Sequence, residues 1–446
     1  MKKSFLKDIL KKLSKKGCHE SDVFYSETKN LSCSSRLGRI EKKEIATIKE
    51  IGIRAIVNKK QSIISSTNLE KKNIDDLVEK VFQMAKVVPM NKYCGLAKSS
   101  ELKKPSKKDL DDLKLFDGYE PSIEKIKENV IILEESALSN KKIINSEGAE
   151  IAFSQNSFCL LGSNGLDIEM KKTHSDYIVA VLAGSKNSME REYDYKSKVF
   201  FKDLGDFKII GKEVAENAVK KLHSKKIKTC KCDVIFDSKV SASLIGNLFN
   251  VTNAQTIIKG TSFLKKRINK KVFNKRINII DNPHMEKKLR SRLYDCEGIE
   301  SNKKYLIKNG DLQFFFNSLS SSRQLNLKPT GHASRAVSSI PSVSYSNLYM
   351  QNGKITKEEM IKSIKRGLLI TELMGSSINY SNGDYSRGAS GFWIENGEVT
   401  HPVSEITIAG NLKEIFLSLI PANDLEFNFG INAPSCYVEN LTLGGK

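Results

Sequence analysis

The hydrophobic pattern of the first 90 residues changes from a helical period to a strand period and back. Residues 4–16 and 68–88 carry apolar residues at helical spacing, whereas residues 22–66 alternate apolar and polar residues. The alternating apolar positions include Val23, Tyr25, Ile51, Ile53, Ala55 and Val57. Turn residues at Gly38 and Asn58 divide this segment, so it predicts an antiparallel meander between two helices. The expected fold class is therefore α+β, with mostly antiparallel sheets and flanking helices.

A second group of elements follows a proline-bearing stretch. Residues 89–121 have little periodicity and predict an irregular crossing. Residues 122–138 predict a helix, and residues 143–201 predict short strands with a hairpin turn at Ser163-Asn164-Gly165. A further helix is expected over residues 206–223.

The basic run after this helix interrupts the periodic pattern and suggests a domain boundary. Its cations are Lys225, Lys226 and Lys228. Beyond it, CDVIF at residues 232–236 predicts a buried strand, followed by a helix over residues 238–253, strands through Leu325 and a strand-rich tail. Since 446 residues exceed the usual single-domain length, we expect an N-terminal α+β domain over 1–228 and a C-terminal strand-rich α+β domain over 229–446.

Composition indicates a globular cytoplasmic protein. The N-terminal lysines interrupt every apolar run that a signal peptide would need, and no apolar stretch approaches the roughly 20 residues of a membrane span. The 8 cysteines are scattered without the spacing of a disulfide scaffold, so reduced thiols are expected.

The formal net charge of +21 raises the question of nucleic-acid binding. The lysines occur as doublets spread over the whole chain, with few aromatic residues interleaved as stacking platforms. A solvated surface, shaped in part by genome composition, explains them better, and no nucleic-acid partner is expected.

The glycine-rich segment from Glu372 to Leu412 contains two motifs that could serve a binding site. Gly383 and Gly388 have the spacing of a phosphate-binding loop, but Ala389 stands where that loop requires Lys, which disfavours a nucleotide site. Asn396-Gly397 predicts a hairpin. One hypothesis is that this hairpin, or an adjoining strand, offers an edge to which an extended peptide can add.

The same segment, ELMGSSINYSNGDYSRGASGFWIENGEVTHPVSEITIAGNL, resembles the TldD/PmbA family of bacterial metallopeptidases, also described as modulators of DNA gyrase. Weaker similarity lies at SSTNL, INSEGAEI, YDCEGI and PTGHAS, and the PmbA branch, also called TldE, is the most similar. The resemblance implies a cytoplasmic α+β protein, a zinc-dependent activity, peptide or unfolded-protein substrates and a TldD-like partner subunit.

TldD-like members carry H-E-x-x-x-H on a helix, and this chain has no such pattern. His19 is followed by Glu20, but Phe24 stands where the second histidine should be. The segment that aligns with the zinc helix reads SASLIGNLFNV, so Gly246, Asn247 and Val251 replace the two ligands and the base. We therefore expect zinc on the partner and no metal or cofactor on this chain, with its catalytic residues unassigned.

Two other hypotheses remain open. The chain could be an autonomous metallopeptidase with unusual ligands among His284, His332, His401 and Cys436. It could also regulate a nucleic-acid enzyme, as its charge suggests. A structural role is the more common one for a histidine such as His332 or His401, or for a lone cysteine such as Cys436.

Overall fold

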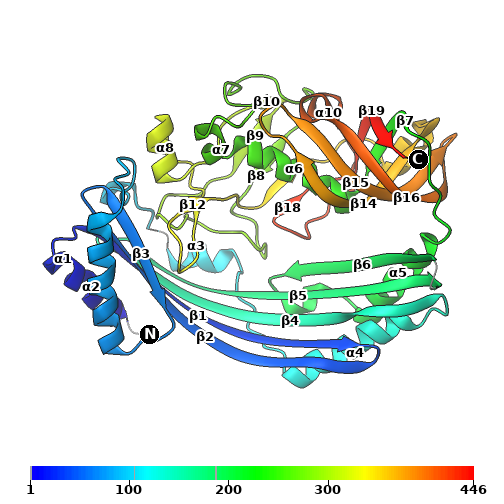
Figure 1. Cartoon of the computed structure of the whole chain (residues 1–446). Helices are drawn as coiled ribbons and strands as arrows, with labels where there is room; N and C mark the ends of the chain where they lie inside the picture. The colour runs from blue at the N-terminus through cyan, green and yellow to red at the C-terminus, as the bar shows by residue number, and fades with distance from the viewer. Residues whose placement is uncertain (1–2, 105, 186–187, 446) are drawn as a thin grey trace.

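The computed structural model describes residues 3–104, 106–185 and 188–445. A long curved sheet forms one layer, and the C-terminal half of the chain lies over it (Figure 1). The sheet has six strands in the order β3-β2-β1-β4-β5-β6, all antiparallel. Their bounds are β1 Glu20–Arg36, β2 Arg39–Val57, β3 Lys60–Ser66, β4 Ile143–Gly162, β5 Asp167–Ser185 and β6 Ser188–Lys198.

The tight turns of this sheet lie where glycine and asparagine were expected to place them. Gly38 has φ 73°, and Asn58 and Lys59 have φ 49° and 62° between β2 and β3. These values lie in the left-handed region that two-residue hairpin turns require. The predicted meander and the hairpin at Gly165 are confirmed.

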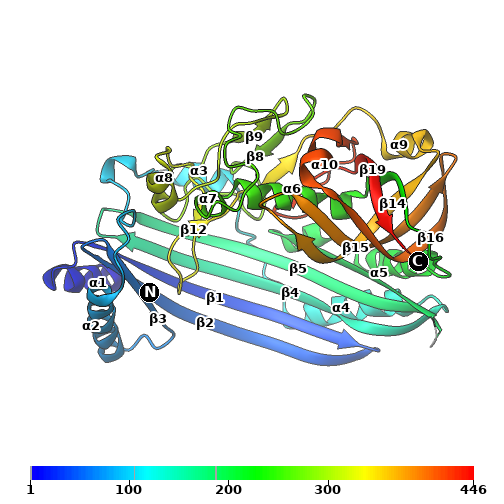
Figure 2. The same ribbon diagram turned by 45° about the horizontal axis from the view of Figure 1, so that its top comes forward.

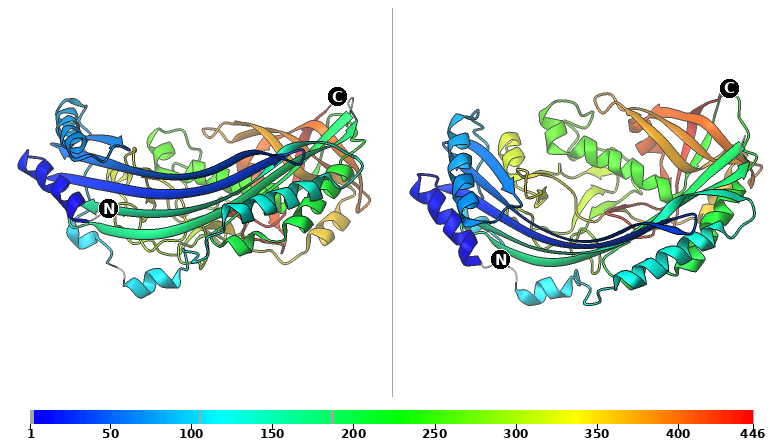
Figure 3. Two further views of the ribbon diagram at one scale, coloured as in Figure 1. Left: turned by 90° about the horizontal axis from the view of Figure 1, so that it is seen from below. Right: turned by 60° about the horizontal axis from the view of Figure 1, so that its bottom comes forward.

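Helices cover one face of the sheet, and Figure 3 shows this face from below. At one end α1 and α2 pack on odd-numbered residues of β1, such as Val23, and at the other end α4 and α5 pack on residues such as Leu31. Period-2 alternation therefore gives one apolar face to the helices along the whole sheet. The helices are α1 Lys3–Lys15, α2 Lys71–Val87, α4 Ile123–Leu138 and α5 Phe207–Lys220.

The C-terminal half contains a sheet that closes on itself. Its strands run β16-β15-β14-β7-β19-β17, and β16 also pairs with β19, so five strands form a ring. Their bounds are β7 Cys230–Phe236, β14 Arg366–Ile378, β15 Asp384–Glu395, β16 Glu398–Asn411, β17 Ile420–Pro421 and β19 Cys436–Gly444. The predicted hairpin at Asn396-Gly397 joins β15 to β16.

A second C-terminal sheet, of order β10-β9-β8-β13-β18, is built from short strands. They are β8 Ile279–Asp281, β9 Lys304–Lys308, β10 Asp311–Leu312, β13 Leu348–Met350 and β18 Ile431–Asn432, with a separate pair β11 Ala333–Ser334 and β12 Ser342–Val343. The C-terminal helices are α6 Ser238–Thr252, α7 Ala254–Ile258, α8 Leu319–Leu325, α9 Lys357–Ser363 and α10 Leu412–Ser418.

Two expectations about local structure need correction. Strands were expected from the end of α6 through Leu325, but most of that segment is turns and loops, because it lacks a sustained period and is held by its burial in the C-terminal core. The crossing over 89–121 was expected to be irregular, yet it contains a 3-10 turn at Ser99–Glu101 and the short helix α3, Lys107–Asp112. A capping box between Ser106 and Asp109 begins that helix.

The C-terminal half rests on the sheet face that the helices leave free (Figure 2). Asp22 of β1 accepts hydrogen bonds from Arg54 of β2 and, at 2.6 Å, from Nη1 of Arg335 in the C-terminal half. The side chains of all three are at most 5% exposed. The two halves also meet closely at Gly52, since a Cβ added there would lie 1.9 Å from the Val337 carbonyl oxygen.

The α+β class with mostly antiparallel sheets is confirmed. The division at residues 228 and 229 stays a prediction, although the six-stranded sheet is built wholly from residues before it. In the described ranges no helix is both long and apolar enough to cross a bilayer. The described cysteines are all free thiols.

Candidate functional site

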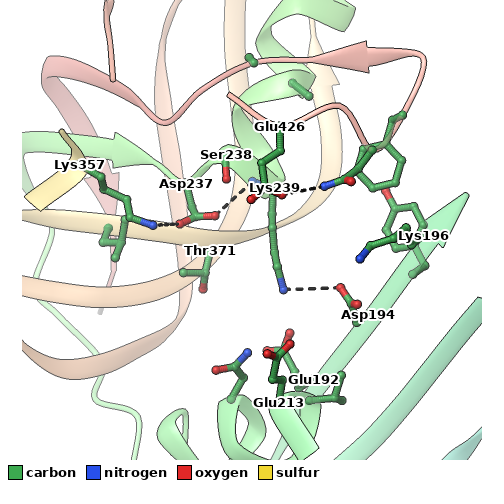
Figure 4. A pocket seen from close by; sticks show the side chains of 18 of the residues that line it. Glu192, Asp194, Lys196, Glu213, Asp237, Ser238, Lys239, Lys357, Thr371 and Glu426 are labelled. Carbon is green, nitrogen blue, oxygen red and sulfur yellow. Dashed lines mark hydrogen bonds and ion pairs between the residues drawn. The ribbon is translucent and has the colours of Figure 1, made fainter. Parts of the chain in front are cut away.

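The cleft between the two halves holds a cavity of about 690 Å³ (Figure 4). Residues of β6 and α5 line one side, and residues of α6, β14 and the segment 426–433 line the other. Lys198 at the end of β6 joins the two sides, because its Nζ donates to the Phe427 carbonyl and to Asn428 Oδ1, each at 2.9 Å. Two structural layers that lie far apart in the sequence thus form one site.

The helix α6 begins at this cleft. Asp237 is its N-cap and accepts a hydrogen bond from the backbone N–H of Lys239 at 3.1 Å. The other Asp237 oxygen lies 3.1 Å from Lys357 Nζ, and Lys239 Nζ reaches across the cleft to 3.7 Å from Asp194 Oδ1 (Figure 4). The acidic side chains of the cavity are Glu192, Asp194, Glu213, Asp237 and Glu426. Both signs of charge therefore line it.

A buried ion cluster joins the two sides of the cleft. Lys221, the C-cap of α5, lies with its Nζ 2.8 Å from Glu192 of β6 and 2.9 Å from Glu372 of β14. Burial works against the ammonium, but the two carboxylates outweigh it and raise the pKa of Lys221. We call these three residues the Lys221 cluster; it fixes the N-terminal sheet to the C-terminal ring.

A second cavity of about 470 Å³ continues from the first. The two share Tyr195, Lys239, Ala242, Phe429 and Ile431 along their walls. The rings of Tyr195 and Phe429 are 4.9 Å apart and come from opposite sides of the cleft. The cleft is therefore one continuous channel with aromatic contacts at its centre.

Models of one known protein family match most of the chain. Three domain models match: PmbA/TldA metallopeptidase domain 1 at residues 21–85, the central domain at 103–222 and the C-terminal domain at 229–445. A "Metalloprotease PmbA homolog" of Buchnera aphidicola is 30% identical over 438 residues, which cover 98% of this chain and 95% of the relative. The chain belongs to the PmbA/TldD metallopeptidase family.

Other members agree with this placement. The "Metalloprotease PmbA" of Escherichia coli O157:H7 is 30% identical, over 96% of this chain and 92% of its own. Among solved structures, a putative modulator of DNA gyrase from Bacteroides thetaiotaomicron has a TM-score of 0.91 at 25% identity, covering 100% of this chain and 99% of that one. TldE from Thermococcus kodakarensis shares the fold, with a TM-score of 0.84 at 20% identity over 99% of both chains.

The segment that was expected to align with a zinc helix forms α6, and its side chains do not fit a zinc ion. Zinc in proteins takes nitrogen, sulfur or carboxylate ligands. Gly246 has no side chain, and an added Cβ would meet Ile431 at 3.9 Å. Asn247 Oδ1 accepts from the Tyr380 hydroxyl at 3.2 Å, and Val251 is fully buried in the core. Over the part of the chain that is described, no three His, Cys, Asp or Glu residues form a metal-binding group.

His332 is a buried structural residue. It is 1% exposed, its Nε2 lies 2.9 Å from Asp281 Oδ2, and Phe314 and Phe316 pack on its ring. Burial lowers the pKa of His332, so its imidazole is neutral at pH 7. Asp281 in turn accepts hydrogen bonds from the backbone and hydroxyl groups of Ser346. Asp281 could not be predicted as the partner of His332 from the sequence, since the two residues are 51 positions apart.

The remaining candidate ligands also lie outside both cavities. Cys436 is 1% exposed, its Sγ donates to the Pro434 carbonyl at 3.2 Å, and burial raises the pKa of its thiol, which stays protonated. His401 lies on β16 with its Nδ1 3.1 Å from Thr400 Oγ1. His284 is exposed on a loop after β8. The structure gives these residues no common site.

Part of the outer strand of the β15–β16 hairpin is already paired, so the strand-addition hypothesis does not apply there and stays a prediction for the rest of the strand. β19 pairs with Thr407–Ala409, and the Lys225 backbone N–H donates to the Pro402 carbonyl at 2.9 Å. Phe392 and Val399 of the hairpin instead line the first cavity through their side chains. The cleft residues themselves were missed, because the only local signal was the helix that begins after Asp237.

Proposed function

We propose that this chain is the PmbA/TldE-like, non-catalytic subunit of a cytoplasmic zinc metallopeptidase complex that acts on peptides or unfolded proteins. A TldD-like subunit supplies the zinc ion and the general base. This chain contributes the cleft beside α6, which holds part of the substrate.

One observation carries the proposal: α6, the helix expected to match the metal-bearing helix of TldD-like members, borders the cleft and offers no zinc ligand there. Lys239, Ala242 and Ser243 of α6 line the cavities, and Gly246 follows one turn later. Neither cavity has a described histidine or cysteine in its wall. A zinc peptidase needs such ligands together with an open coordination position. The carboxylates of the first cavity do not replace them, since no three described His, Cys, Asp or Glu residues form a metal-binding group, so the cleft is proposed to bind substrate and not the ion that activates water.

The chemistry of the cleft suits a peptide. Its walls combine aromatic and aliphatic side chains with carboxylates and lysines, a mixture that contacts apolar side chains, amides and charged groups together. The Lys221 cluster and Lys198 hold the two sides at a fixed separation. A preformed channel loses little conformational entropy when a chain enters it.

The test compares the purified chain, a TldD-like subunit and the co-expressed pair. We expect the chain alone to retain no stoichiometric zinc and to hydrolyse no peptide, whereas the pair co-elutes and hydrolyses peptides until a chelator is added. A pair whose TldD-like subunit has both motif histidines changed to Ala is the matched control and should be inactive. Hydrolysis by this chain alone, with zinc lost on changing His284, His332, His401 or Cys436, would instead establish the autonomous peptidase.

A further inference from the structure

The second cavity of the cleft differs from the first in its charge. Its basic side chains come from three different elements, and no described Asp or Glu lines it. These cations are Lys239 of α6, Arg290 of the loop after β8, and Arg387 of β15. The first cavity, in contrast, is lined by five carboxylates. The channel therefore has a cationic end and a mixed-charge end.

Arg290 is held in place before any ligand arrives. Its guanidinium lies 4.2 Å from the centre of the Tyr345 ring, and its Nη1 donates to Ser344 Oγ at 3.1 Å. The side chain also crosses the backbone of Gly430, where an added Cβ would lie 2.6 Å from Arg290 Cδ and Nε. A guanidinium held over an aromatic face keeps N–H groups at its own edge for a planar anion. The hydrogen-bond partner of Arg290 is a neutral hydroxyl, which does not compensate the positive charge of the guanidinium.

The other cations are arranged in a similar way. Arg387 Nε donates to the Gly375 carbonyl at 2.8 Å, which again leaves the charge without a carboxylate in hydrogen-bond contact. Lys239 stands between the two cavities, and its ion pair with Asp194 is long, at 3.7 Å. On the α6 wall, the Ser243 hydroxyl is buried and has no hydrogen-bond partner among the described residues. This wall therefore offers a donor as well as charge.

We propose that the second cavity binds a carboxylate of the peptide, either an Asp or Glu side chain or the C-terminal carboxylate. This inference rests on the proposed peptide-binding function and names the substrate class: peptides with a negative group at that position. Arginine binds carboxylates through two parallel hydrogen bonds, and the aromatic residues Tyr193, Tyr195 and Tyr345 contact the adjoining carbon atoms. The volume of about 470 Å³ lies within the range of small-ligand sites, about 300–1,000 Å³.

The polarity of the channel also fixes an orientation. With the acidic group in the cationic cavity, the rest of the peptide extends into the first cavity, past Tyr195 and Phe429. There, Glu213 and Glu426 favour an amino terminus or a basic side chain. A peptide with opposite charges at its two ends therefore matches the cleft in one direction.

Fluorescence anisotropy with the full chain tests the proposal. Three labelled peptides of one neutral, flexible sequence differ only in charge: one has a central Glu and an amidated C-terminus, the second has Gln and an amidated C-terminus, and the third has Gln and a free C-terminus. We expect either the first or the third to bind about tenfold tighter than the second, which corresponds to about 1.4 kcal/mol. The first identifies a side chain as the bound group, and the third identifies the terminal carboxylate.

Arg290→Met should remove most of this preference, since the guanidinium that holds the carboxylate is lost. Arg387→Met is the second variant and should weaken the preference in the same direction. Arg276→Met is the matched control, because Arg276 is exposed and lines neither cavity. It should bind all three peptides like the native chain.

Equal affinity for the three peptides, or a preference that survives both Arg290→Met and Arg387→Met, would overturn the inference and leave peptide binding intact. If no peptide bound to this chain or to its complex with the TldD-like subunit, the proposed function would fail, and the inference with it.

Discussion

Replacing Lys221 with Met should be among the most destabilising single changes in this protein. The side chains of Lys221, Glu192 and Glu372 are 10%, 11% and 16% exposed, so removing the ammonium leaves two poorly hydrated carboxylates side by side. Removal of one partner from a buried ion pair costs about 3–5 kcal/mol. We expect a loss of this size for Lys221→Met at about pH 7. Lys220→Met is the matched control, because Lys220 is exposed and its Nζ contacts only Asn217 in the described structure.

The pH dependence separates this electrostatic cause from lost packing. In the native chain the folded pKa of Lys221 is raised, so its contribution is fully present below the unfolded pKa of 10.5 and is lost only as pH rises through the folded value. In Lys221→Met, Glu192 and Glu372 lie side by side without their cation, and protonation of either carboxylate on acidification relieves their repulsion. The variant should therefore regain stability relative to the native chain on acidification.

Urea unfolding followed by circular dichroism, at about pH 7 and about pH 5, measures both effects. Changing Glu192 and Glu372 to Gln in the Lys221→Met background should restore part of the loss at the higher pH. The reasoning is refuted if Lys221→Met unfolds at the same urea concentration as Lys220→Met at about pH 7, or if its deficit is unchanged by acid.

Three further predictions concern the contact between the two halves. Burial, followed by the charge of Asp295, raises the pKa of Glu297 from 4.5 to about 8 in the folded chain. The protein should therefore lose stability as pH rises from 4.5 to 8, and Glu297→Gln should reduce that loss in thermal unfolding. Asp22→Asn removes the charge that holds Arg54 and Arg335, and it should lower the free energy of unfolding by about 3–5 kcal/mol in urea titrations. An unchanged free energy of unfolding would argue against a structural ion cluster. Gly52→Ala places a Cβ 1.9 Å from the Val337 carbonyl oxygen and should expose the loop around Val337 to limited proteolysis. Gly118→Ala is the control: its added Cβ has no atom within 4 Å, so this variant should be cleaved like the native chain.

The sequence was most informative where structure depends on neighbouring residues. Alternation predicted the strands of the first sheet, and turns at Gly38, Asn58 and Gly397 were predicted because left-handed backbone is a local requirement. Ser122 and Asp237 begin helices through side-chain caps close to the expected starts. Each of these features is determined within a few residues.

The site could not be predicted in this way, because its contacts join distant parts of the chain. Lys221 and Glu372 are 151 positions apart, and Lys198 is 229 from Phe427. No period or motif marks such pairs. The bounds of the short strands β8 to β13 could not be predicted for a related reason: two to five residues are too few to show alternation, and their conformation follows from burial in the C-terminal core.

In the proposed complex, α6 serves as a wall of the cleft without holding a metal ion. Its apolar residues Leu244, Ile245 and Leu248 are fully buried, and its first turn is capped by Asp237, so neither packing nor capping depends on a ligand side chain. Gly246 has no side chain and Val251 is fully buried in the core, so neither position offers zinc a ligand. The helix can therefore be kept for its packing, and under the proposed division of roles the TldD-like subunit supplies the converging ligands.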